Sequence, residues 1–488
     1  MLFNSFQFMI FFPIVVLMYF IIPKKVRYIW LLISSYYFYM CWNPKYILLI
    51  LFSTVVTYLC ALAMKRRKFF LVLCLILNLA VLFSFKYFNF AMDNVNLVLN
   101  KLGMEGLNVK FDVLLPVGIS FYTFQALSYT LDVYRGKIEP EKNFLKYALF
   151  VSFFPQLVAG PIERSENLLR QIQNIPKESH WDFDRVKKGM YLILWGLFMK
   201  MVIADRISIF VDNVFADYKA FGTFTLIAGA VGFAIQIYCD FASYSTIAIG
   251  AANVMGFTLM ENFDTPYLAV SVKDFWRRWH ISLSTWFRDY LYIPLGGNRK
   301  GKVRKYLNIM ITFLISGLWH GANWTYIIWG GIHGLYQVIG EILTPIRQKI
   351  SDVFLYNTQS KSHKLLKIFT TFVLTDIAWI FFRADNLKSA VGYIYRMFTK
   401  FDPWVIFDES IFTHGIDFRE GRILIAAILI LIVVDLIKYF KKINLDEIVA
   451  RQNIWFQVLF VFTITMTLVV FGKYGASEEL KSFIYFQF

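Results

Sequence analysis

Two histidines lie inside one of the most apolar stretches of the chain. His320 and His333 fall within Ile309–Gly334, a segment otherwise apolar enough to belong in a lipid bilayer. An ionisable side chain in hydrocarbon is costly unless it faces a protein interior or a water-filled path, so an intramembrane histidine is a candidate for function. The alternative is a buried histidine that is hydrogen-bonded to a neighbouring carbonyl and has no chemical role. Glycines favour the functional interpretation, because they let a backbone or a narrow ligand approach the imidazoles; they are Gly321, Gly330, Gly331 and Gly334.

The whole chain has the composition of a polytopic membrane protein. Of its 488 residues, 58% are hydrophobic and 19% are aromatic, and the apolar residues come in runs instead of periodic stripes. A spanning helix needs about 20 mostly apolar residues, and about eleven or twelve segments meet or approach that length. The clearest are Ser5–Ile22, Tyr46–Met64, Phe69–Phe90, Met190–Val211, Trp324–Leu343 and Trp455–Phe471. We therefore predict an all-α polytopic membrane protein whose first span is not a cleaved signal peptide.

The basic residues predict the orientation of the chain. Its net charge of +17 is explained by cationic cytoplasmic loops, so a nucleic-acid partner is not needed. Basic residues follow the first and the third apolar segments at 24–27 and 65–68, whereas only Lys45 follows the second. The N-terminus and the polar segment Ala91–Lys110, interpreted as a loop, should then lie outside the cytoplasm. The four cysteines show no metal-ligand spacing, so no metal site is predicted.

Two further segments bring polar groups into apolar surroundings. Leu114–Gly136 is dense in aromatic, hydroxyl and amide side chains, which should face other helices or a substrate path instead of lipid. Phe153–Ile172 is interrupted by Pro155, Gly160 and Pro161 and runs directly into charged residues. That pattern is typical of a re-entrant helix or of one that ends at the membrane interface.

Asp240 is an acidic residue within the apolar stretch that begins at Gln236. Small residues follow it, and small residues allow tight packing of helices. We interpret the stretch as mainly structural, with Asp240 as a polar anchor.

The segment Val272–Lys305 alternates tryptophan and tyrosine with arginine. Tryptophan with arginine at moderate hydrophobicity is typical of a helix in the plane of the lipid headgroups. Two roles fit equally: a cytoplasmic anchor of the fold, or a face whose cations bind an anionic donor such as a coenzyme A phosphate. The cations concerned are Arg277, Arg278, Arg288 and Arg299, and His280 lies beside them.

Five motifs follow one another from Leu114 to the last residue. They are LPVGISFYTFQALSYTLDVYRG, FFPQLVAGPIER, DFWRRWHISLSTWFRDYLYIPLGGNR (Asp274–Arg299), GLWHGANW (Gly317–Trp324) and the terminal FIYFQF. In this combination and order the chain resembles the membrane-bound O-acyltransferase superfamily, in the bacterial branch typified by the alginate O-acetyltransferase membrane subunit. One departure is DFASYST (Asp240–Thr246), where similar relatives usually read DFSGYSD: Asp240 is kept and the second acid is lost.

The resemblance implies one membrane domain over 1–488, a helical bundle of about eleven or twelve spans with re-entrant and interfacial helices around a central tunnel. Its expected parts are N-terminal helices at 1–110, a catalytic core at 111–400, a loop insertion at 401–421, and C-terminal helices with an acyl-relay tail at 422–488.

Individual roles are also implied by the resemblance. The family's active-site histidine falls on His320, which suits the chemistry because acyl transfer to a hydroxyl needs a base, and the family's other marked histidine falls on His280. Asn323 or a tunnel amide could stabilise the oxyanion, and His333 could orient the site or simply pack. Tyr485, in the terminal motif, is implied to carry the acyl group as an ester, with aromatic anchoring of the terminus as the alternative. Other residues expected along the tunnel are Trp319, Trp324 and Asp240.

The implied function is transfer of an acetyl group from a cytoplasmic donor, acetyl-CoA, across the membrane for O-acetylation of an extracytoplasmic polysaccharide. No bound cofactor is expected. The expected partners are a secreted or membrane-anchored SGNH-type acetyltransferase, the polysaccharide acceptor and membrane lipid. The expected location is the bacterial cytoplasmic (inner) membrane, with both termini extracytoplasmic. The alternatives are D-alanyl transfer to teichoic acid and lipid or solute transport; transport predicts internal repeats, and the sequence has none that we find.

Overall fold

The computed structural model describes residues 1–64, 67–107, 109–111, 116–158, 160–178, 180–354, 357–408 and 410–473. Within those ranges every regular element is a helix and no strand occurs, which confirms the predicted fold class. The chain divides into two compact units: unit 1 is Met1–Ile193 with Ser245–Met260, and unit 2 is Leu194–Tyr244 with Glu261–Phe488.

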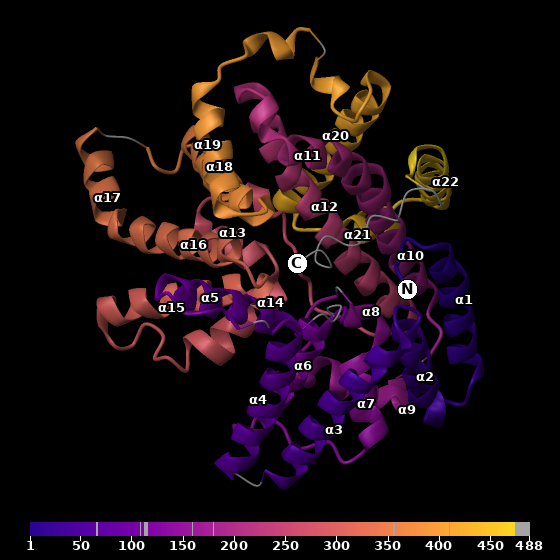
Figure 1. Cartoon of the computed structure of the whole chain (residues 1–488). Helices are drawn as coiled ribbons and strands as arrows, with labels where there is room; N and C mark the ends of the chain where they lie inside the picture. Colours follow the sequence, from indigo (N-terminus) through magenta and orange to yellow (C-terminus); the bar gives the residue numbers. More distant parts are fainter. Residues whose placement is uncertain are drawn as a thin grey trace. The chain divides into compact units, whose positions relative to one another are not determined.

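Unit 1 contains the N-terminal helices. They are α1 (Phe6–Ile21), α2 (Arg27–Met40), α3 (Ile47–Ala63), α4 (Lys68–Leu82), α5 (Phe88–Lys101), α6 (Ile119–Tyr134), α7 (Phe144–Ser152), α8 (Phe154–Leu157), α9 (Arg170–Glu178) and most of α10 (Phe183–Phe198). Helix α2 packs on α7, and α3 packs on α4 and α6 (Figure 1).

Two predictions made for unit 1 have different outcomes. The predicted interruption of Phe153–Ile172 is confirmed, because α8 is a single turn and a π-helical turn at Ser165–Leu169 leads into α9. The predicted loop Ala91–Lys110 is wrong in its first half, since α5 continues to Lys101. Polar residues alone do not end a helix; this one ends where Gly103 adopts the left-handed conformation, with φ of 74°.

Unit 2 contains the remaining helices. They are α11 (Asp205–Ala216), the first part of α12 (Thr223–Met255), α13 (Val272–Arg278), α14 (Ile281–Phe287), α15 (Gly301–His320), α16 (Trp324–Ile342), α17 (Thr344–Val353), α18 (Lys361–Arg383), α19 (Leu387–Thr399), α20 (Phe418–Lys441), α21 (Leu445–Ala450) and α22 (Ile454–Phe471). A π-helical turn, η5 (Met199–Ala204), joins α10 to α11. In the described part of the predicted insertion at 401–421, two short 3₁₀ turns precede α20.

A tight hairpin of α15 and α16 carries two of the candidate histidines. The two helices are joined by residues 321–323 and pack against each other along their length (Figure 1). A Cβ atom at Gly317 would collide with the carbonyl oxygen of Tyr326, and one at Gly330 would collide with that of Phe313. Glycine is therefore required at both positions for the backbones to approach so closely.

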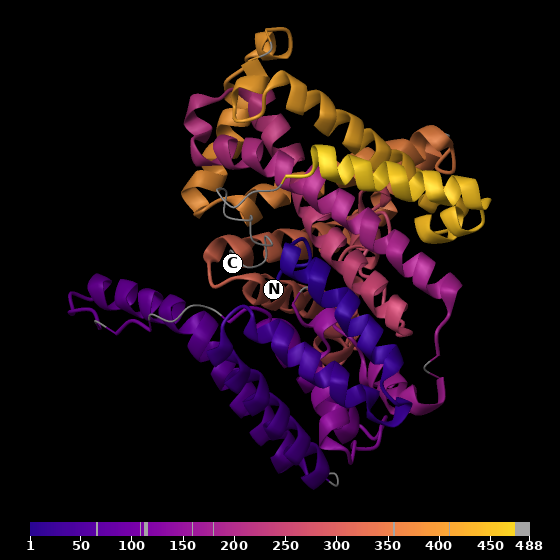
Figure 2. The same ribbon diagram turned by 90° about the vertical axis from the view of Figure 1, so that its right-hand side faces the viewer.

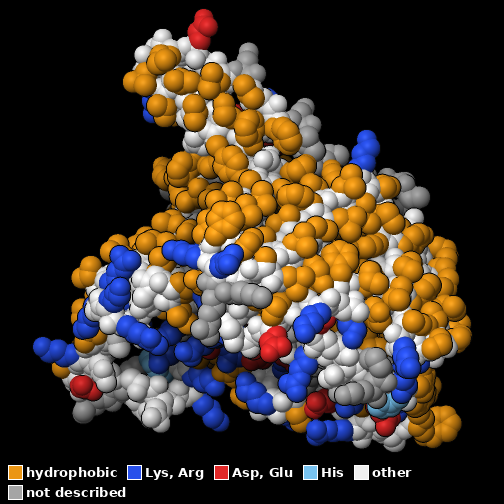
Figure 3. Space-filling model, turned by 90° about the horizontal axis from the view of Figure 1, so that it is seen from below, with side chains coloured by type: hydrophobic (Ala, Val, Ile, Leu, Met, Phe, Trp, Pro, Cys, Tyr) orange, Lys and Arg blue, Asp and Glu red, His pale blue; other side chains and the backbone are white. Residues whose placement is uncertain are grey.

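Six helices in the described part of the chain are long and apolar enough to cross a membrane. They are Pro44–Ala63, Lys68–Lys101, Thr223–Met255, Lys361–Arg383, Phe418–Lys441 and Ile454–Phe471. Other predicted spans appear as shorter or interrupted helices: Ser5–Ile22 contains α1, and Met190–Val211 crosses η5. Helices α20 and α22 expose most of their apolar side chains, and Figure 2 shows α22 (yellow) lying along the outside of its unit. Figure 3 shows a surface covered broadly by hydrophobic side chains, with lysine and arginine gathered in one part of it, as expected of a protein bathed in lipid.

Candidate active site

The three histidines named by the sequence lie in one row of rings within unit 2. Their exposed fractions are 0% for His280, 3% for His320 and 0% for His333. Trp319 separates the first two histidines and Trp329 separates the last two. Ring-centroid distances are 6.2 Å from His280 to Trp319, 4.9 Å from Trp319 to His320, 4.9 Å from His320 to Trp329 and 5.1 Å from Trp329 to His333. We call these five residues the His–Trp row.

Four helices position the row. His320 is the last residue of α15, and Trp329 and His333 lie four residues apart on α16, which places them on one face of that helix. His280 is the residue that precedes α14. Helix α18 closes one side of the row, because Phe382 lies 5.5 Å from His320 and Trp379 stacks on Trp329 at 5.5 Å. The sequence analysis missed both α18 aromatics, although their spacing of three residues puts them on one helix face.

The proton on His333 is located by its neighbour. The indole nitrogen Nε1 of Trp276 lies 3.2 Å from Nδ1 of His333. An indole N–H can only donate, so Nδ1 accepts, and the neutral imidazole carries its proton on Nε2. Nε2 is buried and has no hydrogen-bond partner among the described residues. His333 therefore presents an N–H donor on Nε2.

The tryptophans of Val272–Lys305 lie in the protein interior. Instead of one helix in the headgroup plane, the structure has α13, α14 and a π-helical turn at Arg288–Tyr292. Trp279 is 1% exposed, and Trp276 packs against His333, so the prediction of lipid contact is wrong for these rings. Helical spacing gives α13 an aromatic face, but it does not reveal whether that face meets lipid or protein.

The four predicted donor-binding arginines differ in their surroundings. Arg278 donates to Asp274 at 3.1 Å and lies 3.4 Å from Asp264, so its charge is already paired. Arg288 is exposed and pairs with Asp289 at 2.8 Å. Arg277 and Arg299 are exposed, and they are the better candidates for an anionic ligand.

Asn323 has two structural contacts, and Trp324 is half exposed. The Asn323 side-chain oxygen accepts from the Thr325 backbone N–H at 3.0 Å and caps α16, while its NH₂ group donates to the Asp385 carbonyl at 3.2 Å. One N–H of Asn323 is therefore left for any oxyanion. Trp324 is 50% exposed.

Asp240 belongs to a buried ion cluster. Its Oδ1 lies 2.5 Å from Nζ of Lys200, which also lies 2.8 Å from Oδ1 of Asp205. The adjacent residue Phe241 packs edge-on against His280 at 4.6 Å. Asp240 is thus a buried, charge-paired residue, one residue away from the ring that packs on His280. Lys200 was missed, although a lysine within the apolar stretch Met190–Val211 is itself a signal of a buried partner.

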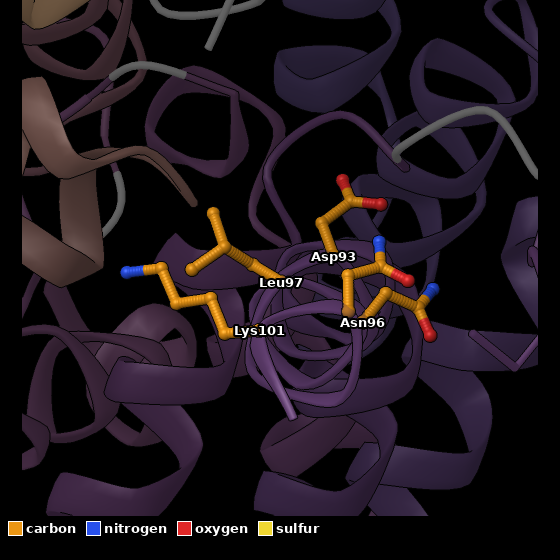
Figure 4. Close-up of a pocket in the computed structure, with 5 residues that line it drawn as sticks. Asp93, Asn96, Leu97 and Lys101 are labelled. Carbon is orange, nitrogen blue, oxygen red and sulfur yellow. The ribbon is translucent and has the colours of Figure 1, made fainter. Parts of the chain in front are cut away.

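Two surface depressions in the described part of the chain contain no residue of the His–Trp row. One lies on α5 and is lined by Asp93, Asn96, Leu97, Asn100 and Lys101; Figure 4 shows these side chains projecting from that single helix. In unit 2, a cavity of about 100 Å³ is lined by Asp212, Arg383, Asp385 and Tyr393, among others. Asp385 is the residue whose carbonyl accepts from Asn323, so this cavity adjoins the turn that follows His320. Tyr485 lies outside the described residues.

Comparison with known proteins identifies the family of the chain. The model of the membrane-bound O-acyltransferase family matches residues 37–378. The chain belongs to this family. It is 40% identical over 408 residues to a probable alginate O-acetylase of Pseudomonas syringae pv. tomato, covering 82% of this chain and 75% of that protein. It is 35% identical over 433 residues to a peptidoglycan O-acetyltransferase of Helicobacter pylori, covering 81% of this chain and 80% of that protein. A teichoic acid D-alanyltransferase of Streptococcus thermophilus is 31% identical over 239 residues, covering 46% of this chain and 56% of that protein.

The protein is therefore a multi-pass membrane O-acyltransferase. The row suits that chemistry, because its aromatic walls exclude water and keep an imidazole neutral. Burial lowers the pKa of His280 to about 3, so this ring is an uncharged base or acceptor at neutral pH.

Proposed function

We propose that this O-acyltransferase moves an acetyl group from cytoplasmic acetyl-CoA across the membrane for O-acetylation of an extracytoplasmic polysaccharide. The observation that carries the proposal is His320, 3% exposed between Trp319, Trp329 and Phe382 in a chain of this family. The relatives that align over about four-fifths of the chain have names that describe alginate and peptidoglycan O-acetylation, which supports acetyl as the acyl group.

His320 acts as the general base in this proposal. A hydroxyl oxygen attacks the thioester carbonyl while the imidazole takes the hydroxyl proton; the carbon–sulfur bond breaks, and the proton passes to the departing thiolate. The N–H on Nε2 of His333 and the remaining N–H of Asn323 are two donors on the α15–α16 hairpin that can stabilise developing negative charge.

Tyr485 is the proposed first acceptor of the acetyl group. A narrow site that holds one buried base does not admit a bulky polymer, so a small hydroxyl can be acylated first and then presented to an SGNH-type partner transferase outside the cytoplasm. Tyr485→Phe keeps the aromatic ring and removes the nucleophile. We expect this variant to lower glycan O-acetylation to the level of cells that lack the gene.

The measurement is mass spectrometry of cell-wall and exported glycans from cells without the gene, complemented with wild type or Tyr485→Phe. Phe486→Tyr in the same tail is the matched control, because it adds a hydroxyl next to the native one and should leave acetylation intact. Normal acetylation by Tyr485→Phe, with no acyl-tyrosine peptide in wild type, would mean that the polymer reaches His320 directly. Unchanged glycans in cells without the gene would overturn the proposed function itself.

The exposed cations Arg277 and Arg299 are proposed to face the cytoplasm and the phosphates of the donor. A single cysteine at the exposed residue Asn298 should therefore react with an impermeant thiol reagent only in inside-out vesicles. Cys41 is exposed and must first be replaced. A cysteine at the exposed residue Asn100 is the control, and it should react only from the opposite side. Reaction of Asn298→Cys in right-side-out vesicles would reverse the orientation.

D-alanyl transfer to teichoic acid is the second candidate, because the teichoic acid D-alanyltransferase of Streptococcus thermophilus aligns with 46% of this chain. The same glycan spectra separate the two functions, since an acetyl ester and a D-alanyl ester differ in mass.

A further inference from the structure

The turn that carries His280 is held by Asn262, which lies in a segment without regular secondary structure. Asn262 meets the turn through its backbone and its side chain: its carbonyl oxygen accepts from Ile281 N–H at 3.0 Å. Its side-chain Oδ1 lies 3.1 Å from Nδ1 of His280 and accepts from the Ser282 hydroxyl at 2.8 Å and from the Ser282 backbone N–H at 3.2 Å. Asn262, His280 and Ser282 are each at most 1% exposed.

The backbone N–H of Ser282 fixes which atom of the Asn262 amide faces the turn. A backbone N–H can only donate, so the amide atom 3.2 Å away must be the oxygen and not the nitrogen. An amide oxygen in turn can only accept. Nδ1 of His280 must therefore donate to Asn262, and in the neutral ring Nε2 carries the lone pair.

Burial supports a single protonation state for His280. It lowers the pKa of this imidazole to about 3, and rings from two helices pack against it, Phe241 from α12 and Trp319 from α15. The cause of the shift is desolvation, because burial disfavours the charged imidazolium. The ring is thus neutral at working pH, and its contact with Asn262 favours the tautomer with the proton on Nδ1.

Two features that are unfavourable for folding occur together at the contact between Asn262 and His280. His280 has a φ of 44°, in the left-handed region that a side chain with a Cβ rarely adopts. The Nδ2 group of Asn262 is buried without a hydrogen-bond partner among the described residues. Strained backbone and an unsatisfied buried donor are tolerated where the surrounding structure enforces one geometry for function.

We propose that Asn262 is a positioning residue that holds His280 as the Nδ1–H tautomer, so that its Nε2 lone pair accepts a proton or a hydroxyl hydrogen bond during acyl transfer. Trp276 holds His333 in the opposite tautomer, with a proton on Nε2. The two outer histidines of the His–Trp row therefore present an acceptor and a donor on either side of His320. This inference rests on the proposed function, and Asn262 itself need not touch the substrate.

The test compares Asn262→Leu, which keeps the approximate volume but removes the acceptor, with Ser282→Ala, which removes a different hydrogen bond to the same oxygen. Acyl transfer is measured as initial rates with radiolabelled acetyl-CoA in membrane vesicles that contain the full-length protein and the native acceptor. We expect Asn262→Leu to lower kcat by about 10²-fold or more, as loss of the correct histidine tautomer does elsewhere, with little change in KM. Ser282→Ala should stay close to wild type.

A double variant separates positioning from a structural role. If Asn262 acts through His280, then Asn262→Leu has no further effect when His280 is already alanine. Multiplicative losses in the double variant, or a wild-type kcat in Asn262→Leu, would overturn the inference and leave the proposed function standing. An inactive wild type would overturn both.

Asn262→Asp tests the same proposal if the Asn262→Leu protein does not accumulate in the membrane. The carboxylate still accepts from Nδ1 and adds a negative charge, which raises the pKa of His280. The ring is then protonated at a higher pH, so the acidic limb of the rate–pH profile should move to higher pH while activity above that limb is retained. An active Asn262→Asp with an unshifted profile would contradict the proposal.

Discussion

His320→Ala is expected to abolish acyl transfer while the protein stays folded in the membrane. A positioned general base contributes roughly 10²–10⁴-fold to the rate, and no other imidazole can replace this one. His280 is bound to Asn262 and His333 to Trp276, so the flanking rings are held in place by their own partners. The rate should therefore fall by about that factor, with KM for acetyl-CoA little changed because the arginines proposed to bind the donor are intact.

The measurement is acyl transfer in vesicles together with glycan O-acetylation in cells. His320→Gln fills most of the imidazole volume and separates loss of the base from loss of packing, and it should be as inactive as His320→Ala. His180→Ala is the matched control, since that histidine is exposed and lies outside the His–Trp row. A well-expressed His320→Ala that acetylates glycans at a near-normal level would refute the assignment.

Hydropathy predicted the helical class correctly because it reports local composition. Long apolar runs such as Tyr46–Met64 and Trp455–Phe471 appear as the helices Pro44–Ala63 and Ile454–Phe471, with small differences at the ends. The helix ends are less predictable, as α5 illustrates. The polar residues of Ala91–Lys110 suggested a loop, whereas the chain stays helical to Lys101 and turns at Gly103.

The candidate site was predictable only as a list of residues. The apolar surroundings of His320 and His333 pointed to function, and the structure brings both into one row with His280. The proton positions on His280 and His333 follow from contacts with Asn262 and Trp276. These partners lie 18 and 57 positions away along the chain. Such pairings depend on how helices pack, and no local pattern in the sequence specifies them. The tryptophans of α13 show the same limit, because an aromatic helix face fits lipid and protein equally well.

Lys200 is the charge whose removal should destabilise the protein most. It is 1% exposed, and its ammonium lies 2.5 Å from Asp240 and 2.8 Å from Asp205. The side chain comes from the π-helical turn η5, so this turn is tied to α11 and α12 by the cluster. Lys200→Met keeps the aliphatic volume but removes the ammonium that pairs with both carboxylates. Breaking a buried pair in this way costs about 3–5 kcal/mol, which is a large fraction of a typical folding free energy.

Thermal stability of the detergent-solubilised protein measures this effect, as the temperature at which half of the monodisperse size-exclusion peak is lost. Lys187→Met is the matched control: Lys187 pairs at 2.9 Å with Asp184, whose side chain is 83% exposed, and its loss should leave the transition unchanged. The combined variant Lys200→Met, Asp205→Asn, Asp240→Asn removes all three charges and should regain much of the stability, because the penalty arises from the uncompensated carboxylates and not from the absence of the ion cluster itself. A Lys200→Met protein as stable as wild type would show that water reaches Asp240, and that the aspartate stands in a hydrated path instead of anchoring α12.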